Sequence, residues 1–214
     1  MATQDIVMAG FGGQGLMAIG KILAKAAMEE CRHVTWMPSY GPEMRGGTAY
    51  CTVIVSERPI GSPIVDVADS VIALNPPSLA KFEALLAPGG ALVLNASLIE
   101  AEPGRTDLET VAIPCTALAR ACGDDRLVSV VALGGLLARR PLVSRDSVRA
   151  ALEEMTGRRP ELLEANLTAF DAGLAAAGGG QPTAETTGSA TVNGATASDA
   201  AISRAQASTT VRSR

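Results

Sequence analysis

The stretch from Asp5 to Ala27 joins two apolar segments of different periodicity through a glycine-rich turn. Ile6–Ala9 is a short apolar run with β-branched residues, which predicts a buried strand. From Leu16 onward the apolar residues recur at helical spacing, which predicts a helix. His33–Met37 predicts a second strand. The order strand, helix, strand predicts a β-α-β unit with a right-handed crossover and parallel strands.

The turn between the first strand and the helix has the sequence Gly-Phe-Gly-Gly-Gln-Gly, which fits the pattern G-x-G-x-x-G. Glycines permit a tight turn and let a backbone approach a phosphate closely. The helix that follows offers unpaired N–H groups and the positive end of its dipole to an anion. We therefore predict a phosphate-binding turn formed by Gly10, Gly12, Gly13, Gln14 and Gly15. The alternative is a turn that only lets the helix pack on the strand.

A second glycine-bearing loop follows the second strand, at residues 38–47. Its two prolines and three glycines keep it out of regular structure. In a doubly wound fold this loop leaves the carboxyl end of a strand, at the same edge as the first glycine turn. Arg45, Gly46 and Gly47 are its candidate ligand contacts, because arginine binds phosphate and glycine allows close approach. The length of the loop disfavours an ordinary connection.

One feature of dinucleotide-binding proteins is missing from this pattern. Such proteins carry an Asp or Glu about 20 residues past the glycine turn, at the end of the second strand, to bind a ribose. Here the strand ends in Thr35, Trp36, Met37 and Pro38, and the next acid, Glu43, lies in the loop. The sequence therefore disfavours NAD as the ligand.

The rest of the chain continues the alternation of strands and helices. Further strands are expected at 48–56, 71–74, 91–94 and 111–113, and further helices at 76–86, 115–121, 127–139, 145–155 and 160–174. Gly134 and Gly135 interrupt one of these helices and indicate close packing there. After residue 177 Gly, Ala, Ser and Thr dominate, a composition that cannot form a packed core.

The fold class predicted from these elements is α/β. We expect a three-layer Rossmann-like domain at residues 1–177, with a mostly parallel sheet and a helical C-terminal part. Residues 178–214 are expected to form a disordered low-complexity tail.

Composition excludes several classes of protein. The net charge is −4 and no cluster of Lys and Arg is interleaved with aromatic residues, which argues against a nucleic-acid partner. No apolar run approaches the ~20 residues that a membrane helix needs, and the N-terminus has no basic flank typical of a secretory signal. We therefore expect a cytoplasmic protein without a membrane partner.

The cysteines and the single histidine show no pattern of a metal or catalytic site. Cys31, Cys51, Cys115 and Cys122 lack the C-x-x-C spacing of zinc and iron–sulfur sites. We expect all four to be small buried residues in a reducing compartment. His33 is expected to be structural, because it has no nearby acid or cysteine partner. No catalytic residue and no metal ligand is therefore assigned.

Several motifs, spread over residues 5–173, resemble the gamma subunits of 2-oxoacid:ferredoxin (acceptor) oxidoreductases of the 2-oxoglutarate, branched-chain and pyruvate types. In chain order they are Gly10–Gly15, Ser39–Gly47, Pro59–Pro63, Ala68-Asp69, Ala87–Gly90 with Asn95, Ile113-Pro114 and Ala132–Gly134. Ser39–Gly47 is the most specific of them. The segment Arg126 to Val130 departs from the family, because many relatives carry an Asn there. No role of that Asn is therefore assigned to a residue of this chain.

The resemblance implies a subunit of a larger enzyme. Such complexes convert a 2-oxoacid and coenzyme A to acyl-CoA and CO2 and reduce ferredoxin. Thiamine diphosphate and iron–sulfur clusters are carried by the alpha, beta and ferredoxin-like delta partners. The variant of Ser39–Gly47 favours 2-oxoglutarate or a branched-chain acid as substrate, while pyruvate and indolepyruvate remain open.

For this chain we hypothesise that the glycine edge faces coenzyme A or the partner subunits. The pyrophosphate would lie on N–H groups of Gly12 to Gly15, and Arg45 would contribute a phosphate contact or an intersubunit ion pair. Two alternatives stay open. One is a free-standing nucleotide-binding oxidoreductase that uses NAD(P) or flavin, and the other is a structural docking subunit whose glycine turn binds nothing.

Overall fold

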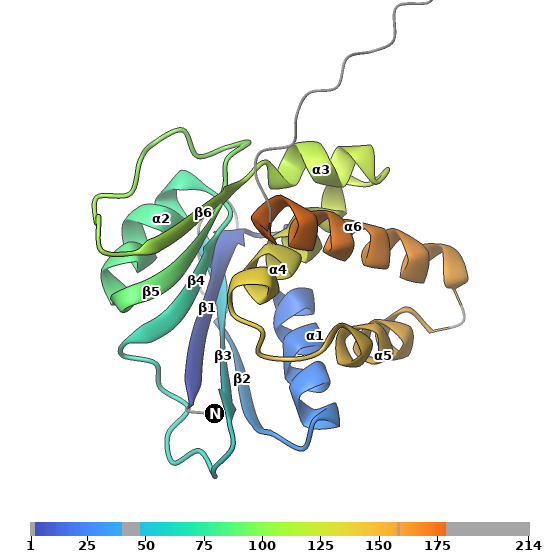
Figure 1. The fold of residues 1–214 in the computed structure, drawn as a ribbon, viewed down its shortest axis with the longest axis horizontal. Helices are drawn as coiled ribbons and strands as arrows, with labels where there is room; N and C mark the ends of the chain where they lie inside the picture. Colours follow the sequence, from blue (N-terminus) through green and yellow to red (C-terminus); the bar gives the residue numbers. More distant parts are fainter. Residues whose placement is uncertain (1–2, 40–47, 158, 179–214) are drawn as a thin grey trace, which may run out of the picture. The chain divides into compact units, whose positions relative to one another are not determined.

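A six-stranded sheet forms the centre of the computed structural model, which describes residues 3–39, 48–157 and 159–178 (Figure 1). The strands are β1 (Gln4–Phe11), β2 (His33–Ser39), β3 (Thr48–Ser56), β4 (Ala68–Ala73), β5 (Leu86–Asn95) and β6 (Glu109–Ile113). The helices are α1 (Leu16–Glu29), α2 (Pro76–Phe82), α3 (Cys115–Ala121), α4 (Val128–Arg139), α5 (Arg145–Thr156) and α6 (Pro160–Gly178). Short 3-10 turns precede β5 and α4, at Glu83–Leu85 and Asp125–Leu127.

The order of the strands across the sheet is β2-β3-β1-β4-β5-β6. β1, β4, β5 and β6 are parallel neighbours, whereas β3 pairs antiparallel with both β1 and β2. Five strands therefore run in one direction and β3 alone runs in the other. The predicted mostly parallel sheet is confirmed. The predicted β-α-β unit is present, but β3 separates its two strands.

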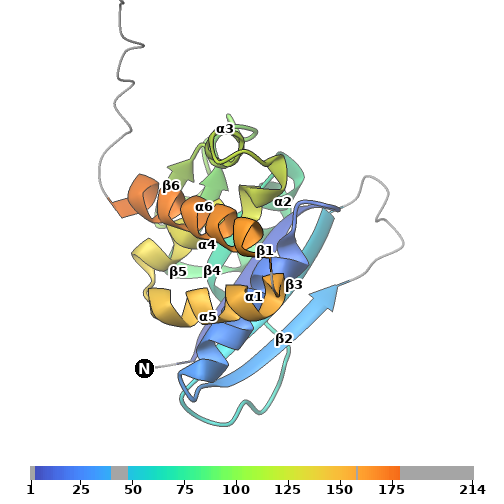
Figure 2. The ribbon, with the colours of Figure 1, turned by 90° about the vertical axis from the view of Figure 1, so that its right-hand side faces the viewer.

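Helices cover the two faces of the sheet unequally. On one face, α1 and α4 pack against the strands, and α5 and α6 pack outside them, which Figure 2 shows from the helical side. On the other face, α2 and the segment around Ile99 cover a smaller apolar cluster that includes Leu79 and Phe82. The three-layer α/β architecture and the helical C-terminal part are therefore as predicted.

The apolar run of β1 is buried on both faces of the sheet. Ile6 and Met8 belong to the larger core under α1 and α4, whereas Val7 and Ala9 belong to the smaller core under α2. A central strand buried on both faces needs a continuous apolar run rather than an alternating one. This explains why Ile6–Ala9 contains no polar residue.

The helix caps follow the local sequence. The side-chain carboxamide oxygen of Asn75 accepts the Ser78 N–H at 2.9 Å, and the Ser144 hydroxyl accepts the Ser147 N–H at 3.1 Å. Gly157 ends α5 with a φ of +63°. These are the termini that capping residues and a terminal glycine predict.

The start of β5 differs from the prediction. Pro88-Gly89-Gly90 was expected to separate a helix ending near residue 86 from a strand at 91–94, but α2 ends at Phe82 and β5 already begins at Leu86. Leu86 pairs with Ala68 of β4, and the register shifts before Ser70 pairs with Ala91. Pairing with β4 therefore extends β5 through Pro88-Gly89-Gly90, although this sequence disfavours a strand. The register shift in the β4–β5 ladder accommodates these residues.

Gly134 of α4 and Gly173 of α6 allow a close crossing of the two helices. A Cβ added at Gly134 would collide with the Phe170 carbonyl oxygen of α6, and one at Gly173 would collide with the Val131 carbonyl oxygen of α4. The two backbones are thus in direct contact from both sides. The predicted close packing at Gly134 is confirmed.

All described residues belong to one compact unit, Met1–Pro182. The predicted domain boundary at residue 177 and the predicted disorder of residues 178–214 concern a segment that, apart from Gly178, lies outside the described residues, so both stay predictions. None of the helices in the described part of the chain is both long and apolar enough to span a bilayer.

Candidate functional site

The glycine turn connects the end of β1 to the start of α1. Gly13 and Gly15 have φ angles of +91° and +81°, so both occupy the left-handed region that favours glycine. Gly15 is the N-cap of α1, and its carbonyl oxygen accepts the N–H groups of Ala18 and Ile19. The turn therefore needs glycine at these two positions for its own conformation, whether or not it binds a ligand.

Gln14 and Gly10, both predicted to be ligand contacts, contribute to the structure of the turn. The Phe11 N–H donates to the Gln14 side-chain oxygen at 2.6 Å. Gly10 is buried, and a Cβ added there would lie 2.5 Å from that same oxygen and 3.0 Å from Leu74 Cβ. The carboxamide of Gln14 thus occupies the space that a side chain at position 10 would take.

Gly12 and Gly13 form the exposed part of the turn, and Gly15 is half-buried. Within the described residues, the N–H groups of these three glycines have no hydrogen-bond acceptor. They lie beside the N-terminus of a 14-residue helix, where the helix dipole is positive. The geometry of Gly12, Gly13 and Gly15 therefore suits an anion.

Arg45, Gly46 and Gly47 lie outside the described residues. The residues that flank their loop are placed, because Thr48 of β3 pairs with Phe11 of β1 and Ser39 of β2 pairs with Tyr50 of β3. The ends of β1 and β2 and the start of β3 are therefore at the same edge of the sheet. The predicted common edge of the two loops is confirmed at these flanking residues.

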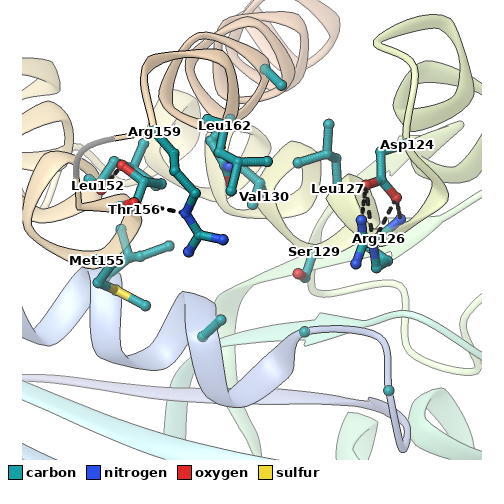
Figure 3. A pocket seen from close by; sticks show the side chains of 16 residues that line it. Asp124, Arg126, Leu127, Ser129, Val130, Leu152, Met155, Thr156, Arg159 and Leu162 are labelled. Carbon is teal, nitrogen blue, oxygen red and sulfur yellow. Dashed lines mark hydrogen bonds and ion pairs between the residues drawn. The ribbon is translucent and has the colours of Figure 1, made fainter.

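Two cavities open on opposite sides of the glycine turn. One, of about 340 Å³, lies toward β2 and β3 and is lined by Phe11, Gly12, Leu16, Ser39 and Ala49 among others. The other, of about 500 Å³, lies toward the helical layer and is lined by residues from α1, α4, α5 and α6 (Figure 3). Gly13, Gly15 and Ala18 line both cavities.

The larger cavity contains two arginines with different partners. Arg126 forms an ion pair with Asp124, with Nη2 to Oδ2 at 2.7 Å and Nε to Oδ2 at 3.0 Å, and these hydrogen bonds hold the pKa of the Asp124 carboxyl below its ordinary value. Arg159 donates only from Nε, to the Thr156 carbonyl oxygen at 3.3 Å. Figure 3 shows the guanidinium of Arg159 reaching into the cavity.

Ser129 lies between these arginines, at the first turn of α4. Its side chain is buried, and a Cβ added to Gly15 would lie 2.6 Å from its hydroxyl oxygen. The absence of a side chain at Gly15 therefore keeps Ser129 in contact with the glycine turn.

The side chains of Asp124, Arg126, Ser129 and Arg159 were not predicted to belong to the site. Arg159 lies far from the glycine turn along the chain. One usable signal was present at Ser129, which is the single polar residue among the apolar residues 127–133. That Ser129 and Arg159 lie near the glycine turn follows only from the packing of α4 and α6.

The cysteines are partly as expected. Cys51 and Cys115 are buried, and burial raises the pKa of each thiol to about 12, so both are protonated at neutral pH. The expectation that all four are buried is wrong for Cys31, which is exposed at the end of α1, and for Cys122, which is half-buried. Among the residues placed in the structure, no group of three or more His, Cys, Asp or Glu could hold a metal ion.

Comparison with known proteins adds a family and three informative relatives. Residues 5–176 match the family model of pyruvate ferredoxin/flavodoxin oxidoreductase. The ketoisovalerate oxidoreductase subunit VorA of Methanothermobacter thermautotrophicus is 36% identical over 169 residues, which cover 78% of this chain and 35% of that protein. The chain thus spans about a third of the length of this relative.

Two solved structures resemble this chain. The gamma subunit of a keto/oxoacid ferredoxin oxidoreductase from Geobacter sulfurreducens has a TM-score of 0.71 and 30% identity, with 81% of this chain and 98% of that chain covered. A 2-oxoglutarate:ferredoxin oxidoreductase from Magnetococcus marinus, with 2-oxoglutarate, coenzyme A and succinyl-CoA bound, has a TM-score of 0.75 and 27% identity. The similarity covers 83% of this chain and 31% of that one.

Proposed function

The chain belongs to the pyruvate ferredoxin/flavodoxin oxidoreductase family as a gamma-type member, and from this premise we propose that it serves as one subunit of a 2-oxoacid:ferredoxin oxidoreductase. The observation that carries the proposal is the match over nearly the whole length of a gamma subunit, 98% of that chain. The complex would oxidatively decarboxylate a 2-oxoacid in the presence of coenzyme A, giving acyl-CoA, CO2 and reduced ferredoxin.

The proposal assigns the reacting cofactors to other subunits. Thiamine diphosphate and iron–sulfur clusters would be held by alpha, beta and ferredoxin-like delta partners, as the family resemblance implies. A branched-chain acid or 2-oxoglutarate is the proposed substrate, since one relative is named for ketoisovalerate and a structural neighbour for 2-oxoglutarate. The substrate would be recognised mainly by the subunits that hold the thiamine cofactor.

For this chain we propose contact with coenzyme A at the glycine turn. The pyrophosphate would accept hydrogen bonds from N–H groups in the segment Gly12 to Gly15, at the positive end of α1, and Arg45, Gly46 and Gly47 would complete the site. The exposed, unpaired N–H groups of the turn fit such a ligand. Coenzyme A in the Magnetococcus marinus structure supports the same ligand class here.

The subunit role is tested by isolating the tagged chain from its own cells under anaerobic conditions. We expect thiamine-dependent and ferredoxin-like partners to co-purify, with brown material that absorbs broadly near 400 nm, the region of iron–sulfur clusters. Activity is then measured with each 2-oxoacid, coenzyme A and ferredoxin. A colourless protein that purifies alone would refute the subunit role and favour a free-standing nucleotide-binding protein.

The role of Arg45 separates coenzyme A binding from docking. If Arg45 contacts a phosphate, Arg45→Ala should raise the apparent KM for coenzyme A about ten-fold or more, since charge-assisted hydrogen bonds contribute about 1.5–3 kcal/mol. Steady-state kinetics of the purified complex measure this change. Arg58→Ala, in the segment after β3, is the control. An unchanged KM together with loss of assembly would favour the docking subunit, in which Gln14 and Gly10 keep the turn closed for packing alone.

A further inference from the structure

The strand β2 forms one edge of the sheet and pairs only with β3 in the described part of the chain (Figure 2). A strand at an edge leaves a row of backbone N–H and C=O groups unpaired, which can pair with a strand of another chain. We propose that β2 pairs with an edge strand of a partner subunit whose side chains toward α1 are apolar and acidic. The inference rests on the proposed subunit role and adds the surface through which this chain assembles.

The hydrogen bonds of the neighbouring strands show which backbone groups of β2 point outward. In a strand the N–H and C=O of one residue point to the same side, and successive residues alternate. The Ala9 carbonyl oxygen accepts the Leu74 N–H at 2.9 Å, so Ala9 bonds toward β4. Its neighbour in β3, Tyr50, therefore bonds away from β1, toward Ser39 of β2.

Alternate residues of β2 therefore face the open edge. Ser39 and Met37 bond toward β3, whereas the backbone groups of Val34 and Trp36 point away from it. Within the described residues, no backbone group pairs with these outward groups. Pro38, which has no N–H, belongs to the same outward series, where an edge strand tolerates proline. The strand also contains no Lys, Arg, Asp or Glu, the residues that commonly prevent pairing at an edge.

A groove between α1 and β2 can receive side chains of the added strand. It has a volume of about 370 Å³ and is lined by Lys21, Ala24, Lys25, Met28, Val34 and Trp36. The Trp36 indole lies against α1, because a Cβ added at Gly20 would be 2.6 Å from Trp36 Nε1. Residues paired opposite Val34 and Trp36 point to the same face of the sheet, which is the face of α1. Met28 is 63% exposed there and offers apolar surface to such a residue.

The charge of the groove indicates an acidic partner. Its lining includes two lysines and no carboxylate. Lys25 pairs with Glu154, whereas Lys21 lies 5.0 Å from the centre of the Trp36 ring and has no ion pair within the described residues. A carboxylate on the added strand would pair with Lys21. A second copy of this chain fits less well, because a two-fold pairing of β2 would bring the lysines of both grooves together.

Hydrogen exchange tests the pairing directly. Exchange at single amides is compared by mass spectrometry between the isolated full chain and the complex purified anaerobically. We expect the N–H groups of Val34 and Trp36 to exchange at least ten-fold more slowly in the complex, because the added strand accepts their hydrogen bonds.

Two variants test the surface through assembly, measured as the partner subunits that the tagged chain retains over a dilution series. Lys21→Glu should weaken retention at least ten-fold, since it places a like charge opposite the acidic strand. Lys81→Glu is the matched control, because Lys81 is also exposed and also lies over an aromatic ring, 5.1 Å from the centre of Tyr50, but on α2. Val34→Pro removes an outward N–H and should weaken retention similarly, with thermal melting to establish that it folds.

The outcomes separate this inference from the subunit role. If the complex forms but Val34 and Trp36 exchange as in the isolated chain, the proposal is overturned and the subunit role stands. Equal retention by Lys21→Glu and Lys81→Glu has the same meaning. A dimer of the isolated chain that protects both amides would assign the edge to a second copy and also overturns the proposal. If no partner co-purifies with the wild-type chain, the subunit role fails and this inference fails with it.

Discussion

Gln14 illustrates how a residue in a binding motif can have a structural role. Its carboxamide accepts the Phe11 N–H and fills the space beside Gly10, so it closes the turn from inside. Gly12 and Gly13 are the exposed part and keep their N–H groups unpaired within the described residues. The residues of the motif thus divide into those that shape the turn and those that can contact a ligand.

Two glycines of the turn differ in what a side chain would meet. Both have positive φ, but a Cβ at Gly13 meets nothing within 4 Å, whereas one at Gly15 would lie 2.6 Å from the Ser129 hydroxyl. Gly13→Ala should therefore lower the free energy of unfolding by about 1 kcal/mol, the cost of the left-handed conformation. Gly15→Ala should cost about 1–3 kcal/mol more, from overpacking. Urea denaturation measures both, and equal losses would contradict the predicted clash.

Asp5 is predicted to destabilise the folded state at neutral pH. Burial and the nearby Asp69 carboxylate raise the pKa of Asp5, and one of its oxygens is buried without a partner in the described residues. Asp5→Asn should therefore raise the free energy of unfolding at pH 7 by roughly 0.5 kcal/mol, a magnitude typical of partly exposed charges.

The pH dependence of this difference has a defined sign. Above both pKa values the Asp5 carboxylate is charged in both states and only the folded state bears the cost. As pH falls through the raised folded pKa, protonation removes that cost and the wild-type chain approaches the variant. Chemical denaturation from pH 7 to pH 4 measures the difference in the free energy of unfolding between the wild-type chain and Asp5→Asn. Asp66→Asn, in an exposed segment, is the control. A difference that grows as the pH falls would contradict the raised pKa of Asp5.

At the scale of elements, the crossing of α4 and α6 depends on the absence of side chains. Gly134→Ala brings a methyl group against the Phe170 carbonyl oxygen, which is backbone, whereas Gly135→Ala meets the end of the Ile113 side chain, which can move. Alanine also favours a helix over glycine by about 1 kcal/mol. Gly134→Ala should therefore destabilise the chain by about 2 kcal/mol net, and Gly135→Ala by less than about 1 kcal/mol. Thermal melting of the two neighbours ranks them, and the reverse order would be inconsistent with this crossing.

Much of the secondary structure was predictable because the local signals agree with the fold. β3 and α3 have the predicted bounds, and Asn75 and Ser144 cap the predicted helices. The reversed direction of β3 was not predictable, since an apolar alternation is the same in parallel and antiparallel strands. The site was predictable only at the glycine turn. Ser129 and Arg159 approach it through helix packing, which no local spacing encodes.

At the scale of the whole molecule, residues 179–214 are predicted to contribute nothing to stability. Their composition cannot bury enough apolar area to offset the entropy of ordering them. A chain that ends at Gly178 should melt within about 1 °C of the full chain, because few stabilising contacts would be lost. Calorimetry of both chains gives the comparison, and a drop of several degrees would mean that this segment packs on the domain.

The position of β3 has a consequence for the order in which the nascent chain can fold. β2 and β3 are close in sequence and pair directly, so they can form a hairpin as soon as both are made. β1 pairs with β3 and β4, both of which follow it in the chain, and its last partner in β4 is Ala73. The apolar run Ile6–Ala9 therefore leaves the ribosome before either of the strands that pair with it. Until those strands are made it is an unpaired apolar strand, a feature that makes a nascent chain prone to aggregation.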